Sequence, residues 1–134
     1  MAEVGAPERS DAADTGSGRV VVLGATGFVG RHVGTALERA GYEVIAVARQ
    51  PRKTPASWRF HPMDLVDSGP RALVDLVEET GPVAVVNAAG EVWSPTADGM
   101  RRSNQLLVDR LLSALAAARH RPRLVQLGSV HEYT

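Results

Sequence analysis

The stretch from Val20 to Gly30 reads Val-Val-Val-Leu-Gly-Ala-Thr-Gly-Phe-Val-Gly, and it joins an apolar run to three glycines spaced three residues apart. Residues 19–23 form the short, branched run that is typical of a parallel strand covered on both faces. Gly24 can turn the chain tightly, Gly27 leaves room for a pyrophosphate to reach the backbone, and Gly30 permits close helix-to-strand packing. The stretch therefore predicts a strand, a phosphate-binding turn and the start of a helix.

Glycine-rich turns with this spacing also occur where nothing binds, so the neighbouring elements decide between the two interpretations. A helix is expected from Phe28 to Ala40, and a second strand from Glu43 to Ala48 follows the turn at Gly41. Together they complete a βαβ unit, which favours the phosphate-binding turn. The stripe of this helix that is expected to face the sheet consists of Val29, Val33, Ala36, Leu37 and Ala40.

The rest of the chain continues the alternation of apolar runs and amphipathic segments. Strands are expected at residues 58–61, 83–86 and 124–127, and helices at residues 70–80 and 97–119. Leu73, Leu76 and Val77 form the core stripe of the first of these helices. The predicted fold is α/β of the Rossmann type, a doubly wound parallel sheet of about five strands in the order 3-2-1-4-5. Residues 1–18 lack apolar periodicity and are expected to be a disordered tail before one domain, residues 19–134.

Composition excludes several classes of function. The 134 residues include fifteen basic and fifteen acidic side chains, so no net charge favours a nucleic acid or an anionic membrane as partner. Cysteine is absent and the four histidines are scattered, which argues against a metal site. The sequence shows no membrane-spanning run and no signal peptide, so we expect a cytoplasmic protein.

Several motifs follow the glycine-rich stretch in a fixed order: Asp64-Leu65, Asn87-Ala88-Ala89-Gly90, Asn104, and Gly128-Ser129 followed by Tyr133. With these motifs the chain resembles the N-terminal portion of an extended short-chain dehydrogenase/reductase, of the NAD-dependent epimerase/dehydratase type. That family includes nucleotide-sugar epimerases, dehydratases and ketoreductases, and the resemblance covers residues 19–133. It implies an oxidoreductase that binds a nicotinamide dinucleotide across the carboxyl ends of the strands and acts on a nucleotide-linked sugar.

The resemblance also implies the residues that contact the cofactor. Asp64 and Leu65 would approach the adenine, although Asp64 could equally cap a helix or turn. Asn87 is more typical of a scaffold residue that bonds the backbone than of a catalyst, and the small residues after it suit a tight turn as well as a ligand. The implied contacts are Gly24, Thr26, Gly27, Phe28, Val29, Gly30, Arg31, Arg49, Asp64, Leu65, Asn87, Ala88, Ala89, Gly90 and Asn104.

The end of the second strand bears on the choice of cofactor. Where the family binds the ribose hydroxyls of NAD with an acidic residue, this chain has Ala48, and Arg49 follows. An arginine suits a 2′-phosphate, so we expect NADP rather than NAD, with Arg31 as a second contact. The alternative is that both arginines are solvated surface residues.

Ser129 matches the serine that bonds the reacting carbonyl or hydroxyl in the family, the alternative being an ordinary serine at a strand end. Its partners, a Tyr-x-x-x-Lys pair, are missing, because Tyr42 is followed four residues later by Ala46 and Lys53 is the only lysine. Trp93 either stacks on a ligand or packs in its loop. Leu107 and Val108 replace the Gly-Thr usually found beyond Asn104.

The missing motif leads to two hypotheses about function. The first is the truncated front half of an NADPH-dependent ketoreductase or epimerase, whose full-length parent is active and could dimerise while these 134 residues alone are inactive. The second is a noncatalytic NADP-binding module or sensor, or an inactive remnant of an enzyme. Arg49 favours ketoreduction within the first hypothesis, since epimerases and dehydratases that recycle their hydride commonly keep NAD.

Overall fold

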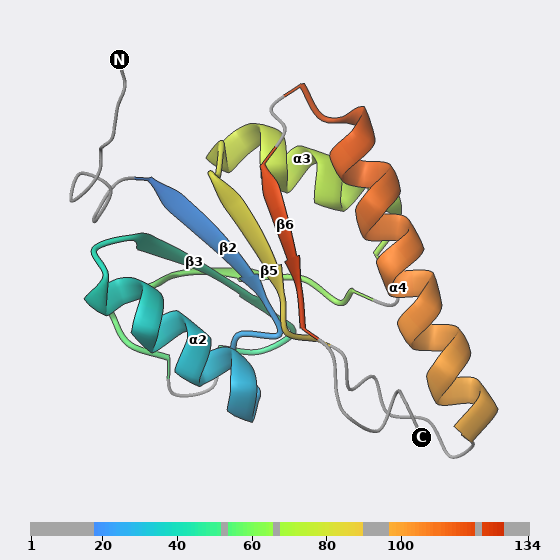
Figure 1. The fold of residues 1–134 in the computed structure, drawn as a ribbon, viewed down its shortest axis with the longest axis horizontal. Helices are drawn as coiled ribbons and strands as arrows, with labels where there is room; N and C mark the ends of the chain where they lie inside the picture. Colours follow the sequence, from blue (N-terminus) through green and yellow to red (C-terminus); the bar gives the residue numbers. More distant parts are fainter. Residues whose placement is uncertain (1–17, 52–53, 66–67, 90–96, 120–121, 128–134) are drawn as a thin grey trace.

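The computed structural model describes residues 18–51, 54–65, 68–89, 97–119 and 122–127, and for residues 70 and 97–104 it describes the backbone only. Five strands form one sheet in the order β4-β3-β2-β5-β6, with every neighbouring pair parallel (Figure 1). In chain order this is the predicted 3-2-1-4-5 arrangement, so the expectation of a Rossmann-type fold is confirmed. The strands are β2 Arg19–Leu23, β3 Glu43–Ala48, β4 Arg59–Pro62, β5 Ala84–Asn87 and β6 Arg123–Gln126.

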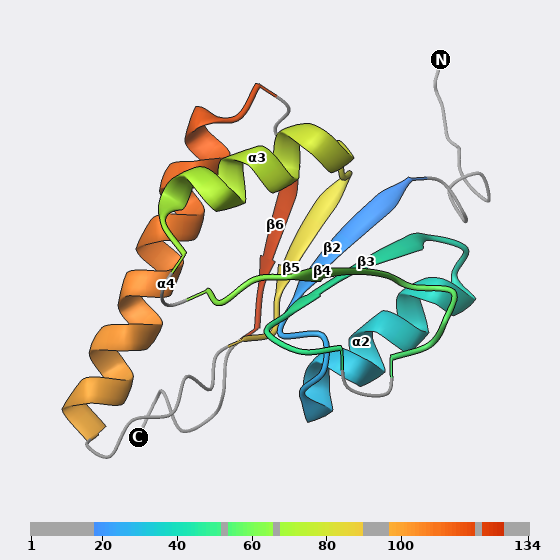
Figure 2. The same cartoon turned by 180° about the vertical axis from the view of Figure 1, so that it is seen from behind.

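Helices cover both faces of the sheet. Helix α2, Phe28–Arg39, lies on one face, and α3, Pro70–Thr80, lies with α4, Ala97–Ala117, on the other (Figures 1 and 2). Parallel strands need such crossovers, because each strand must return to the same end of the sheet before the next begins. No helix within the described ranges is long and apolar enough to cross a membrane.

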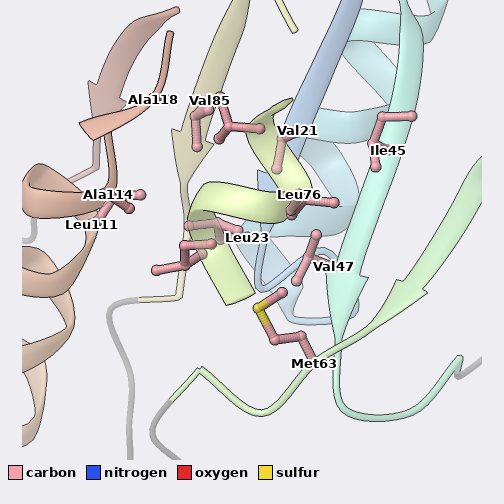
Figure 3. Packing of buried hydrophobic residues seen from close by; sticks show 12 residues of the cluster. Val21, Leu23, Ile45, Val47, Met63, Leu76, Val85, Leu111, Ala114 and Ala118 are labelled. Carbon is pink, nitrogen blue, oxygen red and sulfur yellow. The ribbon is translucent and has the colours of Figure 1, made fainter. Parts of the chain in front are cut away.

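The larger core cluster lies between the sheet and helices α3 and α4 (Figure 3). Val21 and Leu23 of β2 point into it from the centre of the sheet, and Leu76 and Leu111 meet them from the two helices. Leu76 is 1% exposed and Leu111 is fully buried. The predicted core stripe of Leu73, Leu76 and Val77 is therefore confirmed.

Helix α2 approaches the other face by a different surface from the one predicted. Its buried residues are Gly30 and Gly34, whereas Val29, Ala36 and Ala40 are exposed and only Val33 and Leu37 are partly buried. The stripe through Val29, Ala36 and Ala40 is thus wrong. Two glycines four residues apart let the helix backbone come close to its neighbours, so the face that is buried is centred on these glycines and leaves Val29, Ala36 and Ala40 exposed.

Trp58 fills the space that Gly34 leaves. Its indole is 6% exposed, and a Cβ atom on Gly34 would overlap Cη2 and lie 2.7 Å from Cζ2. The indole Nε1 donates to Glu38 Oε1 at 3.2 Å, and the Ser57 hydroxyl donates to Glu38 Oε2. Trp58 therefore packs under α2 just before β4, and the predicted strand over residues 58–61 is shifted to Arg59–Pro62.

Two other strands are shifted by one residue. Strand β5 covers Ala84–Asn87 rather than residues 83–86, and β6 covers Arg123–Gln126 rather than residues 124–127. The parallel register explains both shifts, since Leu23 pairs with Asn87 and Ala84 pairs with Arg123. Helix α4 ends at Ala117, two residues before the expected end.

Candidate functional site

The carboxyl ends of the strands meet at one edge of the sheet, beside the N-terminal end of α2 (Figure 1). Just beyond β2, the amides of Gly24 and Ala25 both donate to the carbonyl of Val47, at 2.9 and 3.2 Å. The amide of Ala88 donates to the carbonyl of Leu23 at 2.9 Å. The turn after β2 is therefore bonded to β3, and the last residue of β2 is bonded to the residue after β5. Open α/β sheets bind their ligands at such an edge.

The three glycines of this turn are needed for different reasons. Gly24 has a φ of +77°, and a Cβ atom there would lie 2.8 Å from the Cα atom of Ala89. A Cβ atom on Gly30 would overlap the carbonyl oxygen of Gly24 and lie 2.8 Å from its carbonyl carbon. On Gly27 it would meet the Gly24 oxygen at 3.4 Å, an ordinary contact and, apart from its chain neighbours, the only one with the described part of the chain. Two of the glycines therefore serve the fold, while the space over Gly27 is open to a ligand.

The first turn of α2 offers unpaired amide groups beside this space. Gly27 is the N-cap and makes no side-chain cap bond, and no acidic residue lies in the first turn. The amide of Arg31 makes the first i to i−4 bond, to the carbonyl of Gly27 at 2.9 Å. The amides of Phe28, Val29 and Gly30 precede that bond and have no intrahelical acceptor. The positive end of the helix dipole adds to them, so the turn suits an anion.

The side chains around the turn are partly apolar and open to solvent. Phe28 is 71% exposed and Val29 is 50% exposed. The Phe28 ring contacts His32 edge to face, with 4.8 Å between ring centroids. Thr26 is partly buried. Exposed apolar groups beside an anion-binding turn give a bound ligand a nonpolar surface to cover.

Two arginines that were predicted to contact a 2′-phosphate lie in or directly after elements that begin or end at this edge of the sheet. Arg49 directly follows β3, whose last residue Ala48 is 8% exposed, and Arg31 is in the first turn of α2. Both arginines are exposed, and neither has an ion-pair partner among the described residues. Their guanidinium groups are therefore available to an anionic ligand.

The segment after β4 begins with a bond back to β3, from the amide of Met63 to the carbonyl of Ala48 at 2.9 Å. Asp64 accepts a backbone bond from Ser68 at 2.8 Å, and Leu65 packs against the larger core cluster. The N-cap of α3 is Gly69, so Asp64 is not the cap of that helix. Asp64 and Leu65 thus lie one strand beyond Arg49, at the same edge of the sheet.

Asn87 ends β5 and is 1% exposed. Its Oδ1 accepts from the amide of Ala89 at 3.1 Å, and its Nδ2 donates to Oε1 of Gln126 at 2.9 Å. Ala88 and Ala89 are partly buried. Gln126 was missed by the sequence analysis, because its pairing with Asn87 becomes visible only from the register of β5 and β6.

Other predicted residues lie outside the described residues. They are Gly90, Trp93, Ser129 and Tyr133. Asn104 belongs to α4, where the described structure is limited to the backbone. Among the side chains that are described, no three His, Asp or Glu groups are placed to hold a metal ion.

A hollow of about 380 Å³ lies at the opposite edge of the sheet, beside the first residues of β2 and β3. Arg19 and Glu43, which line it, bond each other at 3.0 Å, and Arg19 also donates to the carbonyl of Thr80. These groups are already paired, and the chemistry-bearing residues lie at the other edge.

Comparisons with known proteins agree with this arrangement. The profile of the NAD dependent epimerase/dehydratase family matches residues 20–134. A dTDP-6-deoxy-L-talose 4-dehydrogenase (NAD(P)(+)) of Kitasatospora kifunensis is 43% identical over 119 residues, which cover 89% of this chain and 37% of the relative. The chain therefore spans little more than a third of the length of that curated relative.

Solved structures share the fold. The UDP-N-acetylglucosamine 4-epimerase of Bacillus cereus superposes with a TM-score of 0.72 at 20% identity, over 88% of this chain and 40% of that protein. The UDP-glucose 4-epimerase of Brucella ovis in complex with NAD gives a TM-score of 0.67 at 24% identity, over 78% of this chain and 34% of that protein.

Proposed function

This chain belongs to the NAD-dependent epimerase/dehydratase family, and we propose on that basis that it is the NADP(H)-binding portion of an oxidoreductase acting on a nucleotide-linked sugar. The observation that carries the proposal is the open space over Gly27. Among the described residues, a Cβ atom there would meet nothing beyond its chain neighbours closer than 3.4 Å, while the neighbouring helix amides lack intrahelical acceptors. Glycine at this position therefore suits the approach of a pyrophosphate to the backbone.

The residues present fit a dinucleotide along the edge of the sheet. Gly24, Gly27 and the amides of Phe28 to Gly30 would hold the pyrophosphate, and Thr26 and the exposed Phe28 and Val29 would lie beside it. Asp64 and Leu65 would contact the adenine, and Ala88 and Ala89 would leave room for the rest of the cofactor. The bound cofactor supplies the hydride acceptor or donor, and the chain supplies the binding surface and its orientation.

The preference for NADP rests on the end of β3. Ala48 offers no carboxylate to the ribose hydroxyls, and Arg49 beside it is exposed and without an ion-pair partner in the described ranges. A guanidinium binds a phosphate by paired, charge-assisted hydrogen bonds. Arg31, in the first turn of α2, is a second candidate for the same phosphate.

The substrate class follows from the curated relative, which is a 4-dehydrogenase of a dTDP-linked deoxysugar. A nucleotide-linked deoxysugar is accordingly the proposed substrate of the whole protein, with reduction of a keto group as the reaction. Ser129 would hydrogen-bond the reacting carbonyl.

A noncatalytic dinucleotide-binding module is the second candidate. It applies to these 134 residues taken by themselves, which contain no Tyr-x-x-x-Lys pair, the arrangement that supplies the proton in the family. Without that proton an alkoxide formed by hydride transfer is not neutralised.

Two measurements test these proposals. Titration of the chain with NADPH and with NADH, followed by calorimetry, should show binding of NADPH, and binding of neither would overturn the dinucleotide site. Oxidation of NADPH with a panel of dTDP-linked 4-keto sugars then separates the two candidates. We expect binding without turnover for residues 1–134 alone, and turnover by these residues would show that they contain a proton donor.

A further inference from the structure

The buried amide of Asn87 connects two strands and a turn. Asn87 and Thr80 are the two polar side chains classed as buried in the described part of the chain. A buried amide without partners is costly, and Asn87 has one on each side: Gln126 Oε1, which accepts from Nδ2, and the amide of Ala89, which donates to Oδ1. The Asn87 side chain therefore joins β6 to the turn that follows β5.

Two backbone groups, the carbonyl of Leu127 and the amide of Ala89, determine which atoms donate and which accept in these bonds. The carbonyl of Leu127 can only accept, and it takes a bond from Gln126 Nε2 at 3.2 Å. This leaves Gln126 Oε1 to face Asn87, whose Nδ2 must then point toward β6. Asn87 Oδ1 consequently points toward the amide of Ala89, which can only donate. Gln126 and the amide of Ala89 together thus fix which way the Asn87 amide is turned.

The turn held by Asn87 lies directly behind the glycine-rich turn. A Cβ atom on Gly24 would lie 2.8 Å from Cα, 3.0 Å from Cβ and 3.0 Å from the amide nitrogen of Ala89. The carbonyl of Gly24 in turn accepts from the amide of Gly27 at 3.1 Å. A displacement of Ala89 therefore reaches Gly24 and Gly27 through direct contacts, because close-packed backbone cannot absorb it.

We propose that Gln126 is a positioning residue of the dinucleotide site: by orienting the Asn87 amide it holds Ala89 against Gly24 and so maintains the shape of the phosphate-binding turn. This inference rests on the proposed function. Within the described residues, the side chain of Gln126 bonds to Asn87 and to the carbonyl of Leu127, with no bond to the glycine-rich turn, and it lies on the exposed edge strand β6. Dinucleotide affinity therefore depends on a residue of β6, which is separated from β3 by β2 and β5 and lies outside the binding surface.

The test compares three variants of the chain. Gln126→Leu removes the acceptor for Asn87 Nδ2, and Gln126→Glu keeps an oxygen acceptor at the same reach. Thr80→Val is the matched control, because it removes the other buried polar group, whose hydroxyl donates to the carbonyl of Leu76 at 2.7 Å. Thr80 lies at the opposite edge of the sheet, where its own carbonyl accepts from Arg19.

NADPH affinity is measured for all four proteins well below their unfolding midpoints, and the exchange of the Ala89 amide hydrogen is followed by NMR. We expect Gln126→Leu to bind NADPH about two- to thirtyfold more weakly, the range that 0.5 to 2 kcal/mol of coupling represents. The Ala89 amide should exchange faster in this variant. Gln126→Glu should retain affinity, and Thr80→Val should lower the midpoint while leaving affinity unchanged.

The outcomes separate the two proposals. If wild type binds NADPH and Gln126→Leu binds it equally well, the role of Gln126 is refuted and the dinucleotide site stands. Equal losses in Gln126→Leu and Gln126→Glu would also refute it, since the acceptor would then not matter. If wild type binds no dinucleotide, the proposed function itself fails. Because Gln126 is exposed, the Leu variant is expected to fold.

Discussion

Gly30 lies so close to Gly24 that a single methyl group on Gly30 would overlap the carbonyl oxygen of Gly24. This contact joins the first turn of α2 to the end of β2 and sets how near the helix comes to the sheet. The contact is between two backbone segments, so neither side can yield as a flexible side chain would.

Gly30→Ala is accordingly expected to destabilise the fold. Overpacking of this kind costs about 1–3 kcal/mol of unfolding free energy. Urea unfolding followed by circular dichroism measures the change, with Gly69→Ala as control, since a Cβ atom on Gly69 meets none of the described residues within 4 Å. Equal midpoints for the two variants would contradict the close approach of α2.

Gly27→Val is expected to abolish dinucleotide binding with little effect on stability. The added side chain would occupy the space proposed for the pyrophosphate, while the chain itself has room for the Cβ atom. Gly69→Val is a closely matched control, because Gly69 is also a helix N-cap, with φ −75° and ψ 173° against −75° and 172° for Gly27. Calorimetric affinities and unfolding midpoints are compared. Unchanged NADPH affinity in Gly27→Val would place the pyrophosphate elsewhere.

Arg49→Ala is expected to weaken NADPH binding and leave NADH binding nearly unchanged. Hydrogen bonds to a charged group contribute roughly 1.5–3 kcal/mol, which corresponds to about ten- to a hundredfold in affinity. Arg71→Ala provides the control, because Arg71 is a solvated arginine on α3 that pairs with Asp75 at 3.2 Å. The ratio of the two dissociation constants is the readout, and an equal ratio in wild type and Arg49→Ala would remove Arg49 from the site.

Val125→Lys is expected to reduce self-association of the 134-residue chain. Within the described residues β6 has a neighbouring strand on one side only, and Val125 is 39% exposed on it. Open strand edges pair with other chains, and a lysine on the edge opposes this. Leu112→Lys adds the same charge at an exposed leucine of α4 and should have less effect. Light scattering compares the mass distributions, and a larger effect of Leu112→Lys would point to the helix surface instead.

The strand order was predictable because its signals are local. Strands β2, β3 and β5 are short apolar runs, and the right-handed crossover rule then leaves few arrangements. The glycine-rich turn, Arg49 and the Asn87 turn were placed at strand ends by the same signals. These three features lie at the same edge of the sheet because all the strands are parallel, so that their carboxyl ends point the same way.

The predictions were wrong or incomplete where contacts between residues distant in sequence determine which side chains are buried or paired. An apolar stripe treats Gly30 and Gly34 as gaps, yet these are the buried residues of α2, because the partner surfaces are the backbone of Gly24 and the indole of Trp58. Gln126 was missed for a related reason, since the amide pair depends on the register between β5 and β6. A pattern of apolar residues in the sequence shows neither which distant residue a given residue contacts nor how closely the two approach.

Gly34 and Trp58 constrain how this protein can change over generations. A larger residue at position 34 meets the indole, so it is expected to be compatible only with a smaller residue at position 58. Shrinking Trp58 first leaves a void that costs about 3–5 kcal/mol. The two substitutions are thus each harmful alone and compatible together, and the indole contact to Glu38 would be lost on the way. We expect this pair to be exchanged jointly or not at all.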